Sequence, residues 1–390
     1  MTSDALTPFG TTIFTTMSRL AAEFNAVNLS QGFPDFDGPE FLRDAAIEAL
    51  RAGHNQYAPT AGVPALRHAL VAKWKENTGA EIDPDASVTV TAGCTEAIAS
   101  ALLGLLNPGD EVILFEPYYD SYRACVAMAG GVPRFVTLHA STAPGARGFF
   151  FDPADLRKAF TPKTRTLLLN TPHNPTGKVF SREEMQLIAD LCIQHGVVAI
   201  TDEVYERLTY DPARPHIRLA TLPGMAERTI TLSTLGKTYG MTGWKIGWAI
   251  ASPEMSKPVR AAHQFLTYSG STPLQQAAAV AIEKGEPYVA ELVRGFRDAR
   301  DSLAAALEQL GFIVHPSDGT YFIMADHSAF GFPNDVEFCM HLMKEIGVAA
   351  IPPSAFYNRP ELGKSLARFA YCKKPETMQR AVERLQKLRR

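Results

Sequence analysis

Short apolar and β-branched runs alternate with helix-like stretches between about residues 85 and 250. Runs of this length, bounded by turn residues, are typical of buried strands. The runs are "SVTVTAG" (87–93), "EVILFEP" (111–117), "RTLLLNTP" (165–172), "VVAITDE" (197–203), "RTITLST" (228–234) and "KIGWAIA" (245–251). One helix is predicted over about residues 95–106, and another after Ser181, where Glu184 completes a capping-box spacing. The alternation predicts an α/β fold whose large domain has three layers, with helices covering a mostly parallel sheet.

The last hundred residues show a different pattern. A long helical stretch from about Pro287 to Leu310 is followed by short strand-like runs and a C-terminal amphipathic helix. This order of helical and strand-like segments predicts a smaller α+β domain. The first forty residues lack a regular period, and we expect them to join the small domain, so that both chain ends form it. The predicted boundaries are 1–42 for the N-terminal arm and part of the small domain, 43–285 for the large domain and 286–390 for the small C-terminal domain.

Composition narrows the classes of protein to consider. The 390 residues include 38 Lys and Arg against 41 Asp and Glu, a formal net charge of −3, which argues against nucleic acid as a partner. No apolar run approaches the roughly 20 residues that span a membrane, so we expect no membrane partner. The cysteines are widely separated and have neither disulfide-framework nor zinc-site spacing. We therefore expect free thiols, no metal and a cytoplasmic protein without a signal peptide.

Polar or glycine-containing clusters follow successive predicted strands. They lie at residues 93–95, 116–119, 170–177, 202–205 and 233–237. Ligands bind to open parallel sheets beyond the carboxyl ends of the strands. Turn chemistry alone also favours Gly, Pro, Asn and Asp, but it does not explain a cluster after every one of these strands. The pattern predicts one composite site at this edge of the sheet.

The most specific string is "SxxxKxxxxxGWK", formed by Ser233, Lys237, Gly243, Trp244 and Lys245. A desolvated lysine near another cation has a lowered pKa and can form a Schiff base with an aldehyde. Ser233 and Lys245 could then hold a phosphate with amides at a helix start. Taken alone, Lys237 fits a surface loop equally well.

Two nucleotide-binding motifs are excluded in the same region. "GKT" at 236–238 resembles the end of a phosphate-binding loop, but Thr231 stands where that motif needs a glycine. No G-x-G-x-x-G follows the first predicted strand, so a Rossmann dinucleotide site has no support.

Other strings supply groups that suit a charged heteroaromatic ligand. Asp202 follows an apolar run, where a carboxylate needs a cation such as a protonated pyridine nitrogen, although a helix cap is the simpler alternative. Tyr205 could reach a phenolate oxygen on the same ring, and Asn174 could donate to that oxygen or to a substrate carboxylate. Tyr119 could stack on the ring. Arg368, in the apolar "ARFAYC", fits a substrate carboxylate or an internal salt bridge about equally.

Taken in order, seven motifs resemble those of the fold type I aminotransferases that use pyridoxal phosphate. The resemblance extends from about Thr11 to the C-terminus. Within this family, the sequence is most similar to the branch that contains kynurenine aminotransferase (glutamine transaminase K), methionine aminotransferase and N-succinyldiaminopimelate aminotransferase. The motifs are "NLSQGFPDF", "NQYAPTAG", "NTPHNPTG", "TDEVY", "STLGKTYGMTGWKIGW", "GTYF" and "ARFAYC".

The resemblance implies roles by motif position. Lys237, Asp202 and Tyr205 would be catalytic: Lys237 forms the Schiff base with the cofactor, and Asp202 pairs with the pyridine nitrogen. The groups implied to bind the ring or phosphate are Tyr205, Asn174, Tyr119, Ser233, Lys245, the backbone of Cys94 and Thr95, and Tyr57 of the partner subunit. The groups implied to bind substrate are Arg368 at the α-carboxylate, Gly32, Asn174, Phe14, and Tyr268 of the partner subunit. The Asn174–Pro175 bond is expected to be cis. A homodimer with shared active sites is expected.

The implied activity is transfer of an α-amino group to a 2-oxo acid by a ping-pong mechanism. Broad use of methionine, glutamine, aromatic or kynurenine-like donors is expected. Phe14 stands where kynurenine transaminases tend to carry Trp, which weakens the case for kynurenine itself. The alternatives are N-succinyldiaminopimelate aminotransferase of lysine biosynthesis and a cysteine-conjugate carbon–sulfur β-lyase on the same cofactor. A non-catalytic, cofactor-binding transcription regulator is disfavoured, because the net charge of −3 does not suit DNA binding.

Overall fold

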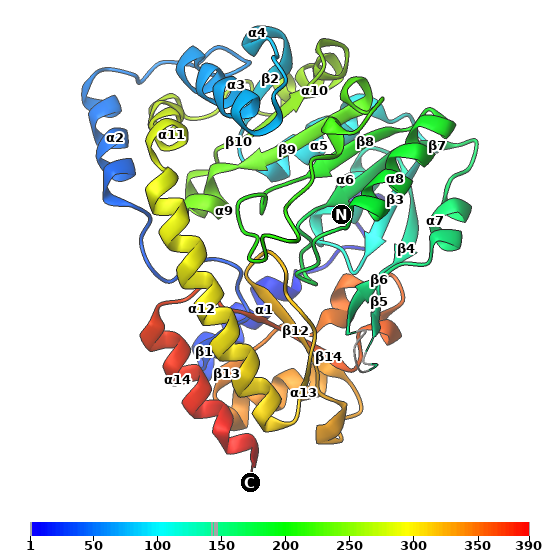
Figure 1. Ribbon diagram of the computed structural model, residues 1–390, viewed down its shortest axis with the longest axis vertical. Coiled ribbons are helices and arrows are strands. Elements are labelled where there is room, and N and C mark those ends of the chain that lie inside the picture. Colours follow the sequence, from blue (N-terminus) through cyan, green and yellow to red (C-terminus); the bar gives the residue numbers. More distant parts are fainter. Residues whose placement is uncertain (1, 142, 144–146, 390) are drawn as a thin grey trace.

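A seven-stranded mixed sheet forms the centre of the larger part of the molecule (Figure 1). The computed structural model describes residues 2–141, 143 and 147–389. The strand order is β2-β10-β9-β8-β7-β3-β4. The run from β9 to β4 is parallel, whereas β10 is antiparallel to both β2 and β9. The strands are β2 (Val88–Thr91), β3 (Glu111–Glu116), β4 (Val132–Thr137), β7 (Thr164–Asn170), β8 (Val198–Asp202), β9 (Thr229–Thr234) and β10 (Gly247–Ala251).

Helices cover both faces of this sheet because its strands are apolar on both faces. On β7, Leu168 belongs to one core cluster together with residues of α5, α6 and α10. Its neighbours Leu167 and Leu169 belong to a second cluster, with residues of α7 and α8. Successive side chains of a strand point to opposite faces, so these clusters lie on opposite sides of the sheet. The helices of this part are α2 (Glu40–Arg51), α3 (Pro64–Thr78), α4 (Pro84–Ser87), α5 (Cys94–Leu105), α6 (Ser121–Met128), α7 (Pro153–Ala159), α8 (Arg182–His195), α9 (Leu235–Tyr239), α10 (Pro253–Leu266) and α11 (Thr272–Lys284).

A second group of elements lies below the sheet in Figure 1. An antiparallel sheet has the order β11-β12-β14, and β1 pairs in parallel with β13. Because β1 and β13 come from opposite ends of the chain, both ends build this part, and the predicted α/β class with a smaller α+β part is confirmed. The boundaries at 42 and 285 stay a prediction. The elements are α1 (Ile13–Glu23), β1 (Val27–Asn28), α12 (Glu286–Leu310), β11 (Ile313–Val314), β12 (Phe322–Asp326), α13 (Asp335–His341), β13 (Val348–Ala349), β14 (Leu366–Ala370) and α14 (Pro375–Leu385); a small hairpin, β5 (His139–Ser141) with β6 (Gly148–Phe150), lies beside them.

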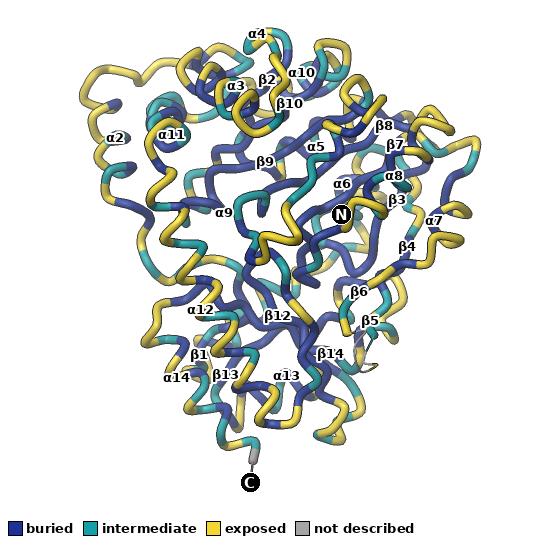
Figure 2. The backbone as a smooth tube through the Cα atoms, viewed as in Figure 1, coloured by how far each residue is buried: buried dark blue, intermediate teal, exposed yellow. Residues whose placement is uncertain are grey.

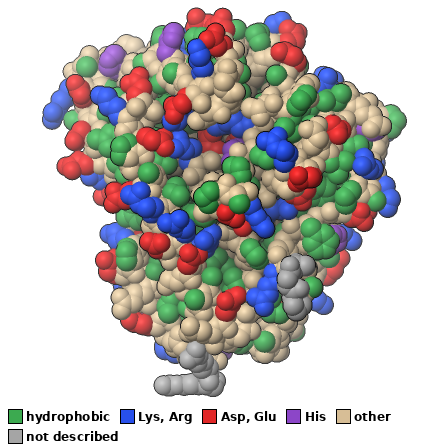
Figure 3. All heavy atoms as spheres, in the orientation of Figure 1, with side chains coloured by type: hydrophobic (Ala, Val, Ile, Leu, Met, Phe, Trp, Pro, Cys, Tyr) green, Lys and Arg blue, Asp and Glu red, His purple; other side chains and the backbone are tan. Residues whose placement is uncertain are grey.

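Burial separates the central strands from the outer surface of the helices. In Figure 2 the central strands are buried, whereas the outer helices are exposed along one side. On the face shown in Figure 3, acidic and basic side chains are intermixed. Within the described part of the chain, no helix has the length and apolarity needed to cross a membrane.

One strand of the seven-stranded sheet, β4, was not predicted. The residues of β4 alternate between exposed and partly buried positions over its first half, and Pro133 interrupts the run. Proline cannot donate a ladder hydrogen bond, so it is tolerated at a sheet edge, where β4 lies.

The capping box predicted at Ser181 is present at the start of α8. The Glu184 amide donates to Ser181 Oγ at 3.2 Å, and the Ser181 amide donates to Glu184 Oε2 at 2.8 Å. We expect Ser181→Ala to lower the free energy of unfolding by about 1 kcal/mol, because the Glu184 backbone amide loses its acceptor, Ser181 Oγ. Urea unfolding would measure this change. Ser181→Asp, which keeps an acceptor, is the matched control, and equal stability of the alanine variant and the unaltered protein would contradict the prediction.

Candidate functional site

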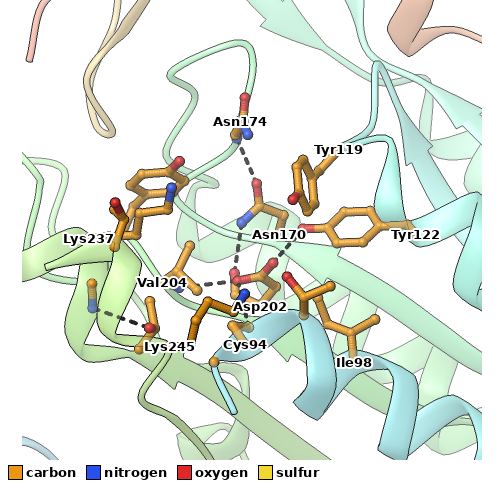
Figure 4. Close-up of a pocket in the computed structure, with 16 residues that line it drawn as sticks. Cys94, Ile98, Tyr119, Tyr122, Asn170, Asn174, Asp202, Val204, Lys237 and Lys245 are labelled. Atoms are coloured by element: carbon orange, nitrogen blue, oxygen red, sulfur yellow. Dashed lines mark hydrogen bonds between the residues drawn. The ribbon is translucent and has the colours of Figure 1, made fainter. Parts of the chain in front are cut away.

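A cavity of ≈ 240 Å³ lies where the parallel strands end (Figure 4). Asn170, Asp202 and Thr234 are the last residues of β7, β8 and β9, and all line it. The residues that follow these strands therefore meet at one cavity, and its use as a binding site stays a prediction. Its lining residues are Gly93, Cys94, Thr95, Ile98, Tyr119, Tyr122, Asn170, Asn174, Asp202, Val204, Tyr205, Thr234, Gly236, Lys237, Thr242 and Lys245.

Asp202 is a buried carboxylate on the floor of this cavity. Its Oδ2 accepts a hydrogen bond from the Tyr122 hydroxyl at 2.6 Å, and its Oδ1 accepts one from the Val204 amide at 3.3 Å. Burial raises the pKa of Asp202, whereas the bond from Tyr122 acts in the opposite direction. Among the described residues, no basic side chain forms an ion pair with it. A buried carboxylate of this kind is completed by a cationic group of a ligand.

Lys237 extends from the short helix α9 toward the same space. Its Nζ donates to the carbonyl oxygen of Gly32 at 3.4 Å and lies 5.8 Å from the centre of the Tyr205 ring. Burial lowers the pKa of Lys237 and outweighs the charges of Cys372 and Asp202, which raise it; the charges of Arg368 and Lys245 lower it further. A lowered pKa increases the fraction of neutral amine, which is the form that acts as nucleophile or base.

An anion-binding corner lies at the start of α5. The residue before the helix, Gly93, has φ of 80°, and among the described residues no side chain caps the amides of the first turn, at Cys94 and Thr95, so they suit a ligand. Lys245 lies against this turn: a Cβ on Gly93 would come within 3.2 Å of Lys245 Nζ. Amides of a helix start together with an ammonium group suit a phosphate.

Ser233 does not belong to this cavity, which corrects the prediction that it lines the phosphate site. Its Oγ donates to Glu206 Oε1 at 2.8 Å, on the other side of β9. Side chains alternate along a strand, so the next residue, Thr234, takes the position on the cavity side. No signal within "TITLST" separates the two hydroxyl residues, because β9 is buried on both faces.

Arg368, on β14, is 1% exposed and has no carboxylate partner among the described residues. Its Nη1 donates to Asn174 Oδ1 and its Nη2 to the Ser30 carbonyl oxygen, each at 2.9 Å. Its Nε is buried and has no hydrogen-bond partner among the residues that the structure describes. Burial lowers the pKa of Arg368 to about 10. The internal salt bridge, which was one of the two interpretations of this residue, is not found in the described structure, and the guanidinium keeps an unused donor for a ligand carboxylate.

Asn174 links Arg368 to the strand ends. The backbone amide of Asn174 donates to Asn170 Oδ1 at 2.6 Å, and Asn170 Nδ2 donates to the Asp202 carbonyl oxygen at 2.9 Å. The Asn174–Pro175 bond is cis, as expected. Asn170 and Tyr122 were not among the residues given individual roles. Asn170 is the last residue of a strand, and Tyr122 is one of three tyrosines close together in the sequence, so neither stands in a distinctive motif.

Gly32 and Phe14 flank the site. The Gly32 carbonyl oxygen accepts from Lys237 and also from the Tyr321 hydroxyl, the latter at 2.6 Å. The Phe14 ring lies 6.4 Å from the Tyr119 ring and 5.3 Å from the Arg368 guanidinium. Both residues therefore border the space between Lys237 and Arg368.

Tyr57 and Tyr268 lie on the surface and do not line the cavity of their own chain. Tyr57 is 84% exposed and Tyr268 is 49% exposed, and their rings meet edge to face at 5.6 Å. The structure therefore does not bring these two predicted site residues to the site within one chain.

Comparison with known proteins agrees with this geometry. A family model described as Aminotransferase class I and II matches residues 25–385. A probable N-succinyldiaminopimelate aminotransferase of Mycobacterium tuberculosis (strain CDC 1551 / Oshkosh) is 48% identical over 394 residues, covering 99% of this chain and 98% of the relative. The methionine aminotransferase of Escherichia coli (strain K12) is 40% identical and is covered over 100% of both chains. The solved structure of N-succinyldiaminopimelate aminotransferase from Mycobacterium tuberculosis, 48% identical, matches over 100% of both chains with a TM-score of 0.95. The fold is therefore aminotransferase fold type I, and the chain belongs to the class I and II aminotransferases, enzymes that use pyridoxal phosphate to move an amino group from an amino acid to a 2-oxo acid.

Proposed function

We propose that the cavity holds pyridoxal phosphate, with Lys237 as its point of attachment and Asp202 as the partner of its ring nitrogen. The donor set supports this assignment: among the described residues no basic side chain forms an ion pair with the buried Asp202, and a pyridinium nitrogen supplies a cation. Tyr205 and Asn174 would bind the ring oxygen, and Tyr119 would stack on the ring. The phosphate would lie on Lys245, Thr234 and the amides of Cys94 and Thr95.

Different side chains of this site would then carry out proton transfer and substrate binding. When bound, the cofactor supplies an aldehyde for the amino group and a ring that accepts the electrons of the bond broken at the substrate Cα. Lys237 would remove the proton at the substrate Cα as a neutral amine and then give a proton to the carbon that carries the cofactor's aldehyde, serving as base and then as acid. Arg368 would hold the α-carboxylate and so set the direction of the Cα–H bond. The observation that carries the proposal is the buried Arg368 with its unused Nε beside Lys237.

We propose a broad range of donors, with ping-pong transfer from methionine, glutamine or aromatic amino acids to a 2-oxo acid. The 40% identical methionine aminotransferase supports this range. The 48% identical relative favours one alternative, N-succinyldiaminopimelate as the physiological donor. A panel of methionine, glutamine, phenylalanine, kynurenine and N-succinyldiaminopimelate against 2-oxoglutarate and pyruvate separates them. Comparable kcat/KM for several donors supports the broad range, whereas a preference of more than about 100-fold for N-succinyldiaminopimelate supports the alternative.

We also propose a cytoplasmic homodimer with shared active sites. All the cysteines are free and buried, which suits a reducing compartment. The surface that carries Tyr57 and Tyr268 also exposes Phe265 (86%) and Leu266. Large exposed apolar side chains gathered in this way favour a subunit interface. Across a two-fold interface, Tyr57 and Tyr268 of the partner subunit would complete each site.

Shared sites predict that two inactive variants restore activity to each other. Lys237→Ala removes the amine and Tyr57→Ala removes the neighbour's contribution. In a mixed dimer, the chain carrying Tyr57→Ala keeps its own Lys237 and receives an intact Tyr57, so one complete site forms. We expect activity to rise well above the sum of the two separate variants after they are unfolded together and refolded. A mixture no more active than that sum, despite mixed dimers seen by mass spectrometry, would contradict shared sites.

A further inference from the structure

A buried carboxylate, Glu96, closes the turn that carries the proposed phosphate-binding amides. Glu96 lies in the first turn of α5, directly after the cavity-lining residues Cys94 and Thr95, and its side chain is 10% exposed. Its Oε2 accepts a hydrogen bond from the backbone amide of Ala92 at 2.6 Å, and its Oε1 accepts one from the Ser100 hydroxyl at 2.9 Å. The backbone of this turn therefore follows the position of the carboxylate.

His263, in the last turn of α10, holds Glu96 from the neighbouring helix. The residue is fully buried; its Nδ1 lies 2.8 Å from Glu96 Oε1, and its Nε2 lies 2.9 Å from the carbonyl oxygen of Thr60. Burial raises the pKa of Glu96, but the hydrogen bonds to its carboxylate, above all that from His263, outweigh burial, so the net shift is downward. An ionised carboxylate and a carbonyl oxygen only accept hydrogen bonds, so the ring satisfies both only when each of its nitrogens carries a proton.

The same residue also contacts the segments that carry the two surface tyrosines. Thr60 follows Tyr57 in the loop between α2 and α3. Thr267 Oγ1 lies 3.2 Å from His263 Nδ1, and the backbone amide of Tyr268 donates to the His263 carbonyl oxygen at 3.1 Å. His263 therefore joins the phosphate-binding turn of its own chain to the surface that is proposed to serve the partner subunit.

We propose that His263 is a buried imidazolium that positions the phosphate-binding turn through Glu96, and the loop that carries Tyr57 through Thr60. His263 does not line the cavity, so it is a positioning residue and not a catalytic one. A neutral ring could donate to only one of its two acceptors and would leave the other without that hydrogen bond. This inference rests on the proposed function, because it requires the phosphate of the cofactor at the start of α5. It makes phosphate recognition depend on two residues, His263 and Glu96, that lie outside the cavity.

Two ligands that differ in the phosphate test the proposal. Pyridoxal phosphate and pyridoxal are titrated into the full-length, cofactor-free protein, and their dissociation constants are measured by fluorescence. We expect His263→Ala to weaken binding of pyridoxal phosphate by at least about 10-fold, because a hydrogen bond between charged groups is lost, and to leave binding of pyridoxal nearly unchanged. Glu96→Gln should act in the same direction, because an amide offers one accepting oxygen in place of two. The double variant should bind no more weakly than the weaker single variant, because both changes break one unit.

A neutron structure of the unaltered protein at neutral pH tests the charge without any variant. Deuterium is expected on both ring nitrogens of His263, and a neutral ring would overturn the inference. His195→Ala, at an exposed histidine in the last turn of α8 that does not line the cavity, is the matched control and should change neither affinity. If His263→Ala weakens both ligands by the same factor, or if His195→Ala reproduces its effect, the positioning role is overturned. If the unaltered protein binds pyridoxal phosphate without attaching it at Lys237, it is the proposed function that fails.

Discussion

Replacement of Lys237 by alanine should lower kcat for transamination by at least about 10⁴-fold. General acid–base catalysis by one positioned side chain contributes up to about this factor, and Lys237 is proposed both to attach the cofactor and to transfer the proton. Its burial penalises the ammonium form, so removing it should not destabilise the fold. The loss should therefore appear as lost turnover in a folded protein, measured by single-turnover kinetics alongside thermal unfolding.

Two further variants separate chemistry from charge. Lys237→Arg keeps a cation but cannot supply a neutral amine near pH 7, because a guanidinium stays protonated, so it should be as inactive as the alanine variant. Lys158→Ala, at an exposed lysine that lines no part of the cavity, should keep full activity. After borohydride reduction, mass spectrometry should find the cofactor on the peptide that contains Lys237. Turnover by Lys237→Ala above about a tenth of the unaltered rate would refute the assigned role.

The sequence was sufficient to predict where the candidate site lies, because charged and polar residues directly follow the apolar runs of the predicted strands. Asp202 after a largely apolar run and Lys237 after the next strand both predict chemistry at one edge, and the structure brings them to one cavity. The same logic predicted the capping box at Ser181, since it depends only on local spacing. Capping motifs and strand-end residues can be predicted from the sequence, because each depends on residues that are close together in the chain.

Features that depend on side-chain direction or on distant contacts were not predictable in this way. Ser233 and Thr234 are both hydroxyl residues beside Lys237, and only the pleat of β9 decides that Thr234 lines the cavity while Ser233 bonds to Glu206. The bond from Tyr122 to Asp202 joins residues 80 positions apart. The edge strand β4 is half exposed and contains Pro133, which hides its pattern.

Arg368→Ala should lower kcat/KM for α-amino acids by roughly 30- to 5000-fold, equivalent to about 2–5 kcal/mol for removing one partner of a desolvated charge pair. The guanidinium is buried and has an Nε without a protein partner, so the α-carboxylate is proposed to complete its hydrogen bonding. Arg368→Lys keeps the charge without the fork and should fall between the alanine variant and the unaltered enzyme. Because burial lowers the pKa of Arg368 only to about 10, the residue stays charged at neutral pH. The size of the defect should therefore not change between pH 6 and 8.

Loss of Arg368 also leaves Asn174 Oδ1 and the Ser30 carbonyl oxygen without their donor, so the variant is expected to lose stability as well as activity. A comparison of L-phenylalanine with 2-phenylethylamine, the same amine without the carboxylate, removes this ambiguity. A purely structural role lowers both rates by the same factor and leaves their ratio intact. Recognition of the carboxylate by Arg368 instead predicts that the advantage of L-phenylalanine over the amine collapses in Arg368→Ala, because the carboxylate then enters a buried site without its cation. An unchanged ratio would assign Arg368 to the fold and would require another cation for the α-carboxylate.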